Sequence, residues 1–237
     1  KVARILTCRE AYDHDGRRID EERLGSLASH IFVFKIGVLT SEAFLEDIEA
    51  GLEEWLPRIK PTDSAFLAAA IQVGVSPKAV FHEEPRIDFL PFKPEVRFSA
   101  SLHRLAPGRE RIYFVGAAED VMASSGSCYD NGEVSGFQSY YGRINDVWSE
   151  SVEKGERVLG VAFRDVALDA FPRDTEEIRA LFRNLTFVGL VSFYDPIRPD
   201  VPEAIQLAKS AGIRSIVITG DHAGTARAAA ERIGLDL

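Results

Sequence analysis

The stretch from Leu185 to Ala226 constrains the fold of this chain more than any other. It contains an apolar run of strand length at Phe187 to Phe193, a stretch with helical spacing after Pro199, and a second apolar run at Ile213 to Ile218. Proline suits the first turn of a helix, where its missing N–H is not needed, and Gly212 suits the left-handed end of that helix. Two short apolar strands joined by a helix predict a right-handed βαβ unit in a parallel sheet.

Polar residues follow the second predicted strand directly. Thr219, Gly220 and Asp221 come immediately after Ile218. Open parallel sheets bind ligands beyond the carboxyl ends of their strands. We therefore expect these three residues to line a ligand site; the alternative is an ordinary α/β unit with a polar loop.

Composition places the chain among globular proteins. Its 237 residues suffice for one large domain or two modest ones, and 46% hydrophobic with 27% charged residues argues against wholesale disorder. The net charge of −9 argues against a general nucleic-acid binder, because phosphate backbones require a basic surface. Two cysteines, Cys8 and Cys128, are too few for a disulfide framework, so we expect both to be reduced.

The sequence contains no membrane or metal signature. No apolar run reaches the roughly 18–20 residues that span a bilayer, and no signal peptide opens the chain. The first residue is Lys1 and the only methionine is Met122, so we expect a piece of a larger protein that does not itself insert into a membrane. The five histidines are dispersed, and no spacing predicts a metal site.

Two motifs of the C-terminal stretch resemble the phosphorylation domain of P-type cation-transport ATPases. Asp195 to Ile205 reads DPIRPDVPEAI, and Thr219 to Ala226 reads TGDHAGTA. In that family a DPPR-type hinge precedes a TGD-x-x-x-TA loop on a haloacid-dehalogenase-like sheet. The resemblance implies that Thr219, Gly220 and Asp221 line a phosphoryl site and that Asp195 and Arg198 lie at the hinge.

The resemblance extends to an N-terminal segment whose chemistry departs from the family. We predict a short strand at Ile31 to Phe34 and a loop at Lys35 to Thr40, in the frame of D-K-T-G-T-L-T. Lys35 agrees with that pattern, but Phe34 stands at the aspartate that becomes an aspartyl-phosphate. Phenylalanine has no nucleophile and cannot ligate Mg²⁺. The alternative is a core strand and turn without any catalytic history.

The region between these segments resembles the inserted nucleotide-binding domain of the pumps. A predicted helix starts in Lys60 to Ala65 (KPTDSA), a half-buried strand spans Val96 to Arg104, and Val115 to Glu119 (VGAAE) resembles K-G-A-P-E with the lysine replaced. The resemblance implies six nucleotide contacts: Asp63 near the adenine amino group, Phe92 stacked on adenine, Arg97 and Arg157 near phosphates, and Gly116 with Ala117 in the VGAAE segment. Asp63, Phe92 and Arg157 also have ordinary interpretations as helix, core and surface residues.

Together these features predict an α/β chain with a partial doubly wound parallel sheet and an inserted α+β domain built on an antiparallel sheet. The predicted boundaries are 1–41 and 187–237 for the phosphorylation domain and 42–186 for the nucleotide-binding domain, with a loop over Ser124 to Gly136. The resemblance implies ATP as ligand and Mg²⁺ as the family's metal, with an incomplete metal site here. It implies the transmembrane and actuator domains of a pump as partners, on the cytoplasmic face of a membrane.

The expected function is the ATP-binding region of a cation pump. We expect this chain itself to be inactive, because Phe34 replaces the acceptor and the family's Mg²⁺-binding loop does not occur in the sequence. One alternative is a pseudo-ATPase module that binds nucleotide weakly or serves as an interaction surface. Another is a free-standing haloacid-dehalogenase phosphatase, which also needs an aspartate at position 34.

Overall fold

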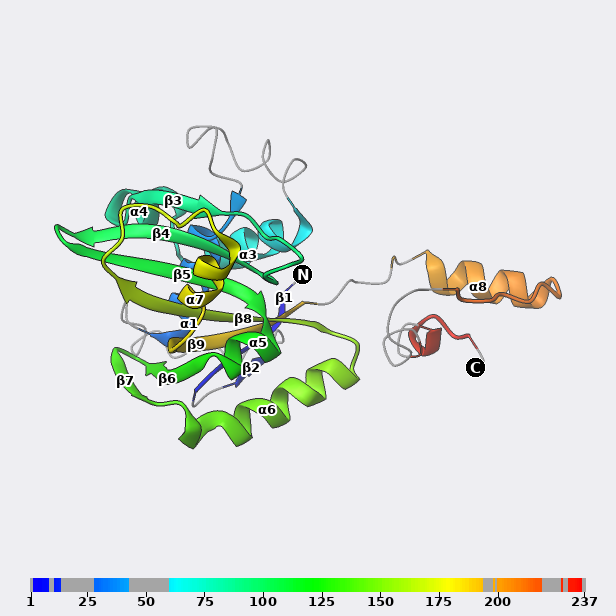
Figure 1. Cartoon of the computed structure of the whole chain (residues 1–237). Helices are drawn as coiled ribbons and strands as arrows, with labels where there is room; N and C mark the ends of the chain where they lie inside the picture. The colour runs from blue at the N-terminus through cyan, green and yellow to red at the C-terminus, as the bar shows by residue number, and fades with distance from the viewer. Residues whose placement is uncertain are drawn as a thin grey trace.

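The structure is a computed structural model that describes residues 2–8, 11–13, 28–42, 60–193, 198, 200–218, 227 and 230–235 (Figure 1). Its centre is a nine-stranded sheet of order β2-β1-β9-β8-β5-β4-β3, with β6 joined to β9 and β7 to β6. Among these strands only β6 and β9 pair in parallel. The strands are β1 (Val2–Thr7), β2 (Ala11–Asp13), β3 (Arg86–Leu90), β4 (Phe98–Ala106), β5 (Arg109–Ala117), β6 (Ser125–Asp130), β7 (Glu133–Gly136), β8 (Arg157–Val166) and β9 (Leu185–Phe193).

Helices cover both faces of this sheet (Figure 1). One face carries α1 (Ser29–Leu39), α3 (Pro61–Gln72) and α4 (Pro77–Glu83); the other carries α5 (Ala118–Ala123), α6 (Gln138–Glu153) and α7 (Thr175–Leu181). A further helix, α8 (Val201–Ser210), buries none of its residues and lies away from the sheet (Figure 1). Within the described ranges no single helix is long and apolar enough to cross a membrane; α3 and α4 pass that test only together, as a pair bent by 94°.

Side chains alternate along β5 and divide the core into two layers. Ile112 and Phe114 pack on the side of α5 to α7, whereas Tyr113 and Val115 pack on the side of α1. Because both faces are covered, the half-buried pattern predicted for residues 96–104 is wrong. His103, on the face predicted to be in solvent, is fully buried, and its ring centroid lies 6.2 Å from that of Phe81 in α4.

Several predicted elements are confirmed. The apolar run at Phe187 to Phe193 forms most of β9, and the helix predicted after Pro199 is α8, followed by Gly212 at φ 76°. The hairpin predicted around Pro107-Gly108 is β4 with β5, where Gly108 has φ 71°. The antiparallel sheet expected for the inserted domain is therefore present.

The strand predicted at Ile31 to Phe34 and the loop predicted at Lys35 to Thr40 are wrong, because these residues belong mostly to α1. Nine of its eleven residues are buried, which is typical of a helix that is apolar on all sides. Periodicity alone cannot distinguish a short buried strand from such a helix. Gly37 permits close packing with α3, since a Cβ at that position would clash with the ring of Phe66.

The predicted βαβ unit does not form in the described residues. Ile213 to Ile218 is not a strand, and the side chains of Ile213, Ile216 and Ile218 are 62%, 75% and 93% exposed. The reason lies in β9, which pairs with β8 along one edge and with β1 and β6 along the other. No edge of β9 remains for residues 213–218, so the predicted haloacid-dehalogenase-like sheet is not seen in the part of the chain that the structure describes.

The loop predicted over Ser124 to Gly136 is instead largely the hairpin of β6 and β7. Its turn consists of Asn131 at φ 49° and Gly132 at φ 100°. Two positive φ angles at an Asn-Gly pair are typical of a type I′ turn, which suits the twist of a tight hairpin. The Asn-Gly dipeptide was the available signal for this hairpin.

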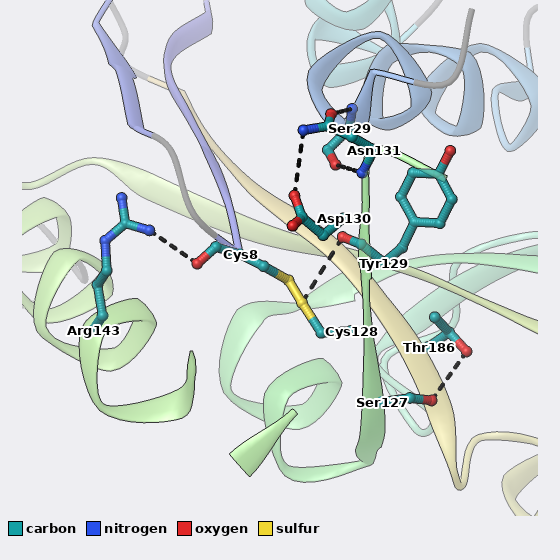
Figure 2. The surroundings of a disulfide bond; sticks show 9 residues. All are labelled: Cys8, Ser29, Ser127, Cys128, Tyr129, Asp130, Asn131, Arg143 and Thr186. Atoms are coloured by element: carbon teal, nitrogen blue, oxygen red, sulfur yellow. Dashed lines mark hydrogen bonds between the residues drawn. A yellow bond between two sulfur atoms is a disulfide. The ribbon is translucent and has the colours of Figure 1, made fainter. Parts of the chain in front are cut away.

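A disulfide joins the two strands that share an edge of β9 (Figure 2). β1 and β6 run toward each other along that edge, because Thr7 pairs with Gly189 and Cys128 with Phe187. Cys8 and Cys128 meet at the junction with Cα atoms 6.6 Å apart, so the prediction of two reduced cysteines is wrong. The Cys8 carbonyl also accepts a hydrogen bond from Arg143 of α6 at 2.9 Å (Figure 2).

We predict that the double substitution Cys8→Ala with Cys128→Ala lowers the melting temperature of the oxidised protein. The bridge spans a sequence separation of 120 residues, and loop-closure entropy for that length is worth about 5 kcal/mol in the chain-entropy model. Calorimetry in a low concentration of urea, with and without reductant, measures the melting temperature. The double variant is the control, because it has no disulfide to reduce and its melting temperature should not respond to reductant. Equal melting temperatures for both proteins under oxidising conditions would contradict the prediction.

We also predict that His103 makes stability depend on pH. Its Nδ1 lies 2.8 Å from the Glu84 carbonyl oxygen, and burial lowers the pKa of the imidazole to about 4. Since an unfolded histidine titrates near 6.5, only the unfolded chain takes up this proton between those values. The stabilisation is therefore complete above about pH 6.5 and is lost as pH falls toward 4, by on the order of 3 kcal/mol.

Urea unfolding at a series of pH values measures this dependence. The His103→Gln variant, which keeps a polar group at the site, is expected to show a flatter profile over the same interval. An unchanged slope would show that His103 does not titrate as burial requires.

Candidate functional site

A cleft of about 280 Å³ opens beside α1, at one end of strands β4, β5 and β8. Four parts of the chain supply its walls: the end of α1, the start of α3, the segment after β3, and the strand ends. The lining residues are Gly37, Thr40, Glu42, Lys60, Pro61, Thr62, Asp63, Phe66, Phe92, Ser99, Val115, Gly116, Arg157 and Leu159.

The structure brings together four of the six residues predicted to contact a nucleotide. Asp63 comes from the first turn of α3, Phe92 from the segment after β3, Gly116 from β5 and Arg157 from the start of β8. These residues are far apart in sequence and share one cavity because β5 and β8 are neighbours in the sheet. Their role in binding stays a prediction.

The other two predicted contacts do not line the cleft. Arg97 adopts φ 60° just before β4, and its guanidinium pairs with Glu119 and, at 3.2 Å, with Asp120. These carboxylates raise the pKa of Arg97, first through the hydrogen bond that its guanidinium donates to Glu119. Ala117 donates its N–H to the Arg97 carbonyl at 3.2 Å. Both residues therefore serve the junction of β4, β5 and α5.

The residues predicted for phosphoryl chemistry are not assembled in the described part of the chain. Phe34 belongs to α1 and its side chain is 4% exposed in the core, and Lys35 pairs with Glu84 at 2.7 Å, outside the cleft. Arg198 is exposed and lies 3.7 Å from Asp200. The remaining predicted residues, Asp195, Thr219, Gly220 and Asp221, lie outside the described residues.

Phe92 is the exposed aromatic of the cleft. Its side chain is 47% exposed, although it directly follows the strand β3 and Pro91. A large aromatic that contacts a cavity and remains half in solvent offers a flat apolar face to a ligand.

Gly116, in the same cleft, is required by packing within the sheet. A Cβ at this position would lie 2.8 Å from the Cβ of Phe98.

Asp63 carries an unfavourable charge in the cleft wall. Its Oδ2 accepts the Glu42 N–H at 3.2 Å, which ties α3 to the residues that follow α1. Burial raises the pKa of the Asp63 carboxyl, the nearby Glu42 carboxylate raises it further, and Lys60 and the hydrogen bonds lower it. A carboxylate kept in a cleft at a cost to folding is typical of a binding residue.

Sequence reasoning missed an ion pair in the same wall. Lys60 Nζ lies 2.6 Å from Glu42 Oε1, and both residues line the cleft. Lys60 stands directly before Pro61, so the signal was a cation adjoining the predicted helix start. Glu42 comes from the short segment after α1 and is the first residue of the predicted nucleotide-binding domain, 42–186.

Arg86, which the sequence reasoning also missed, positions the residues at and after the end of α1. Its guanidinium donates to the carbonyl of Leu39, the last residue of α1, and to the carbonyl of Ser41 at 2.8 Å. Burial lowers the pKa of Arg86 to about 10, and its guanidinium carbon lies 4.9 Å from the ring centroid of Phe81. These contacts hold the residues that contribute Thr40 and Glu42 to the cleft.

The described residues contain no group of three or more histidine, cysteine, aspartate or glutamate side chains that could hold a metal ion. The donors of the cleft itself, Glu42 and Asp63, are occupied by Lys60 and by a backbone N–H. These residues therefore do not fit a magnesium site.

Comparison with known proteins identifies relatives of this arrangement. Residues 32–200 match the family model described as P-type ATPase, cytoplasmic domain N. The cation-transporting ATPase pma1 of Synechocystis is 32% identical over 184 residues, which is 77% of this chain and 20% of the relative. The human sodium/potassium-transporting ATPase subunit alpha-4 is 32% identical over 187 residues, 73% of this chain and 18% of the relative. The chain thus spans about a fifth of these relatives.

We predict that Asp63→Asn raises the melting temperature and weakens ligand binding. Because the pKa is raised, the charged form opposes folding. The full cost applies above the folded pKa and is relieved as pH falls through it toward 3.8, the ordinary pKa of an aspartate. The asparagine oxygen keeps the acceptor for the Glu42 N–H. Thermal melts near neutral pH and near pH 3.5 measure the difference, which is expected to shrink at the lower pH.

The control for this prediction is Asp169→Asn, because the Asp169 side chain is 99% exposed. That change is expected to leave the melting temperature unaltered. A lower melting temperature for Asp63→Asn near neutral pH would show that the carboxylate contributes to folding.

Proposed function

Because this chain belongs to the P-type ATPase cytoplasmic domain N family, we propose that its cleft binds ATP. The observation that carries the proposal is the half-exposed ring of Phe92 in a cavity that also contains Asp63 and Arg157. An aromatic face, an acceptor for an amino group and a cation are the three groups that a purine nucleotide needs. They come from three separate elements and converge on one cavity.

Each group has a definite role in the proposed complex. The adenine ring stacks on Phe92, a contact worth about 1–3 kcal/mol per base in nucleic-acid complexes. The Asp63 carboxylate accepts a hydrogen bond from the adenine amino group, and Arg157 binds phosphate oxygens in a charge-assisted pair. Val115 and Leu159 complete the wall of the cleft with apolar side chains.

The relatives named above are cation-transporting ATPases, and we propose that this chain is the nucleotide-binding part of such a pump. It would then work at the cytoplasmic face of a membrane, with the pump's transmembrane and actuator domains as partners. The shared core of β1, α1 and β9 favours one unit for the described residues between 2 and 193, rather than a boundary near residue 42.

We further propose that the chain binds ATP without hydrolysing it. Phe34 is a buried residue of α1 and offers no nucleophile, and the described residues do not fit a magnesium site. Phosphoryl transfer needs a nucleophile, a metal and a clamp for the leaving group in one place. Phosphate release above background by the purified chain would overturn this part of the proposal.

We predict that the chain binds ATP and that Phe92→Ala weakens binding about tenfold, in line with the loss of one stacking contact. Isothermal titration calorimetry measures the affinity. The matched control is Tyr141→Ala, because Tyr141 is a 39% exposed aromatic on α6 outside the cleft, and this change is expected to leave affinity unaltered. Absence of binding at millimolar ATP would favour an interaction module instead.

A further inference from the structure

The ion pair between Lys60 and Glu42 lies inside the proposed nucleotide cleft. Lys60 Nζ and Glu42 Oε1 are 2.6 Å apart, and the two side chains are 54% and 32% exposed. Lys60 immediately precedes the first residue of α3, and Glu42 follows the end of α1. The pair therefore bridges the two helices at the solvent-facing part of the cavity.

The charges of the cleft are otherwise unsuited to a polyphosphate. Two carboxylates, Glu42 and Asp63, and two cations, Lys60 and Arg157, line it. Position 115 on β5 holds a buried valine, and Arg97 is turned toward Glu119 and Asp120. Within the described residues, the cleft has only Lys60 besides Arg157 to offset a bound anion.

Lys60 is free to change partners at little cost. Exposed ion pairs contribute little to stability, because water and salt screen them and both long side chains lose freedom. A lysine ammonium is a compact charge on a flexible stem, so Nζ can move away from Glu42 without any backbone change. A phosphate oxygen offers it a partner of higher charge.

We propose that Lys60 binds a phosphate group of the nucleotide and that Glu42 holds this lysine when the cleft is empty. Glu42 thereby lowers affinity, since each bound nucleotide must take Lys60 from it and approach its carboxylate. Val115 lines the same cleft without a charge, so Lys60 supplies the cation that this position lacks. This inference rests on the proposed function and adds the residue that recognises the anionic part of the ligand.

The test compares ATP with adenosine by isothermal titration calorimetry. Lys60→Met is expected to weaken ATP binding about tenfold, as for the loss of one charge-assisted hydrogen bond, and to leave adenosine binding unaltered. Glu42→Gln is expected to tighten ATP binding severalfold, because the lysine is released and a negative charge removed. The matched control is Lys154→Met, since Lys154 pairs with Glu150 at 2.5 Å with similar exposure but outside the cleft.

The outcomes separate this inference from the proposed function. If the unaltered chain binds neither ATP nor adenosine, both fail. If it binds ATP and Lys60→Met binds equally well, only the role of Lys60 is overturned. If Lys60→Met weakens ATP and adenosine equally, Lys60 acts through Asp63 and not on phosphate, and the inference is again overturned. Loss for ATP alone, with Lys154→Met unchanged, supports it.

Discussion

Hydrogen bonding along both edges of β9 is the constraint on which the rest of this structure depends. β8 pairs with one edge over its length, while β1 and β6 divide the other edge end to end. The N-terminal strand, the hairpin of β6 and β7 and the long antiparallel sheet are thereby joined in one layer. The Cys8–Cys128 disulfide closes the junction where β1 and β6 meet.

The buried helix α1 packs on this layer and forms part of the cleft wall. It covers the face that carries Tyr113, Val115 and Val161, and Arg86 holds the carbonyls at its end. The cleft exists because α1 stops at Leu39, leaving Thr40 to Glu42 between the helix and the start of α3. Helix α1 thus belongs both to the core that stabilises the sheet and to the wall of the cleft.

Sequence patterns predicted best where local chemistry decides the structure. The β4–β5 hairpin, α3 and α8 follow from alternation, from Pro-Gly and from proline at a helix start. Sequence patterns failed to predict α1, because an evenly apolar stretch has no period. They also failed for residues 213–218, because strand formation there depends on a free sheet edge. Asp63 and Phe92 were predicted from motifs that resemble the family. The pairing of Lys60 with Glu42 could not be predicted, because it depends on α1 and α3 being adjacent.

The cleft also shows how binding and stability oppose each other in one wall. Burial raises the pKa of Asp63, so its charged form costs folding free energy near neutral pH. The Glu42 N–H reduces that cost through its hydrogen bond and Lys60 reduces it through its charge, whereas the Glu42 carboxylate increases it. In the empty cleft the Lys60 ammonium therefore offsets the charges of both Glu42 and Asp63. In the proposed complex a phosphate takes Lys60, and the Asp63 carboxylate is then stabilised by its hydrogen bonds and by the amino group of the ligand.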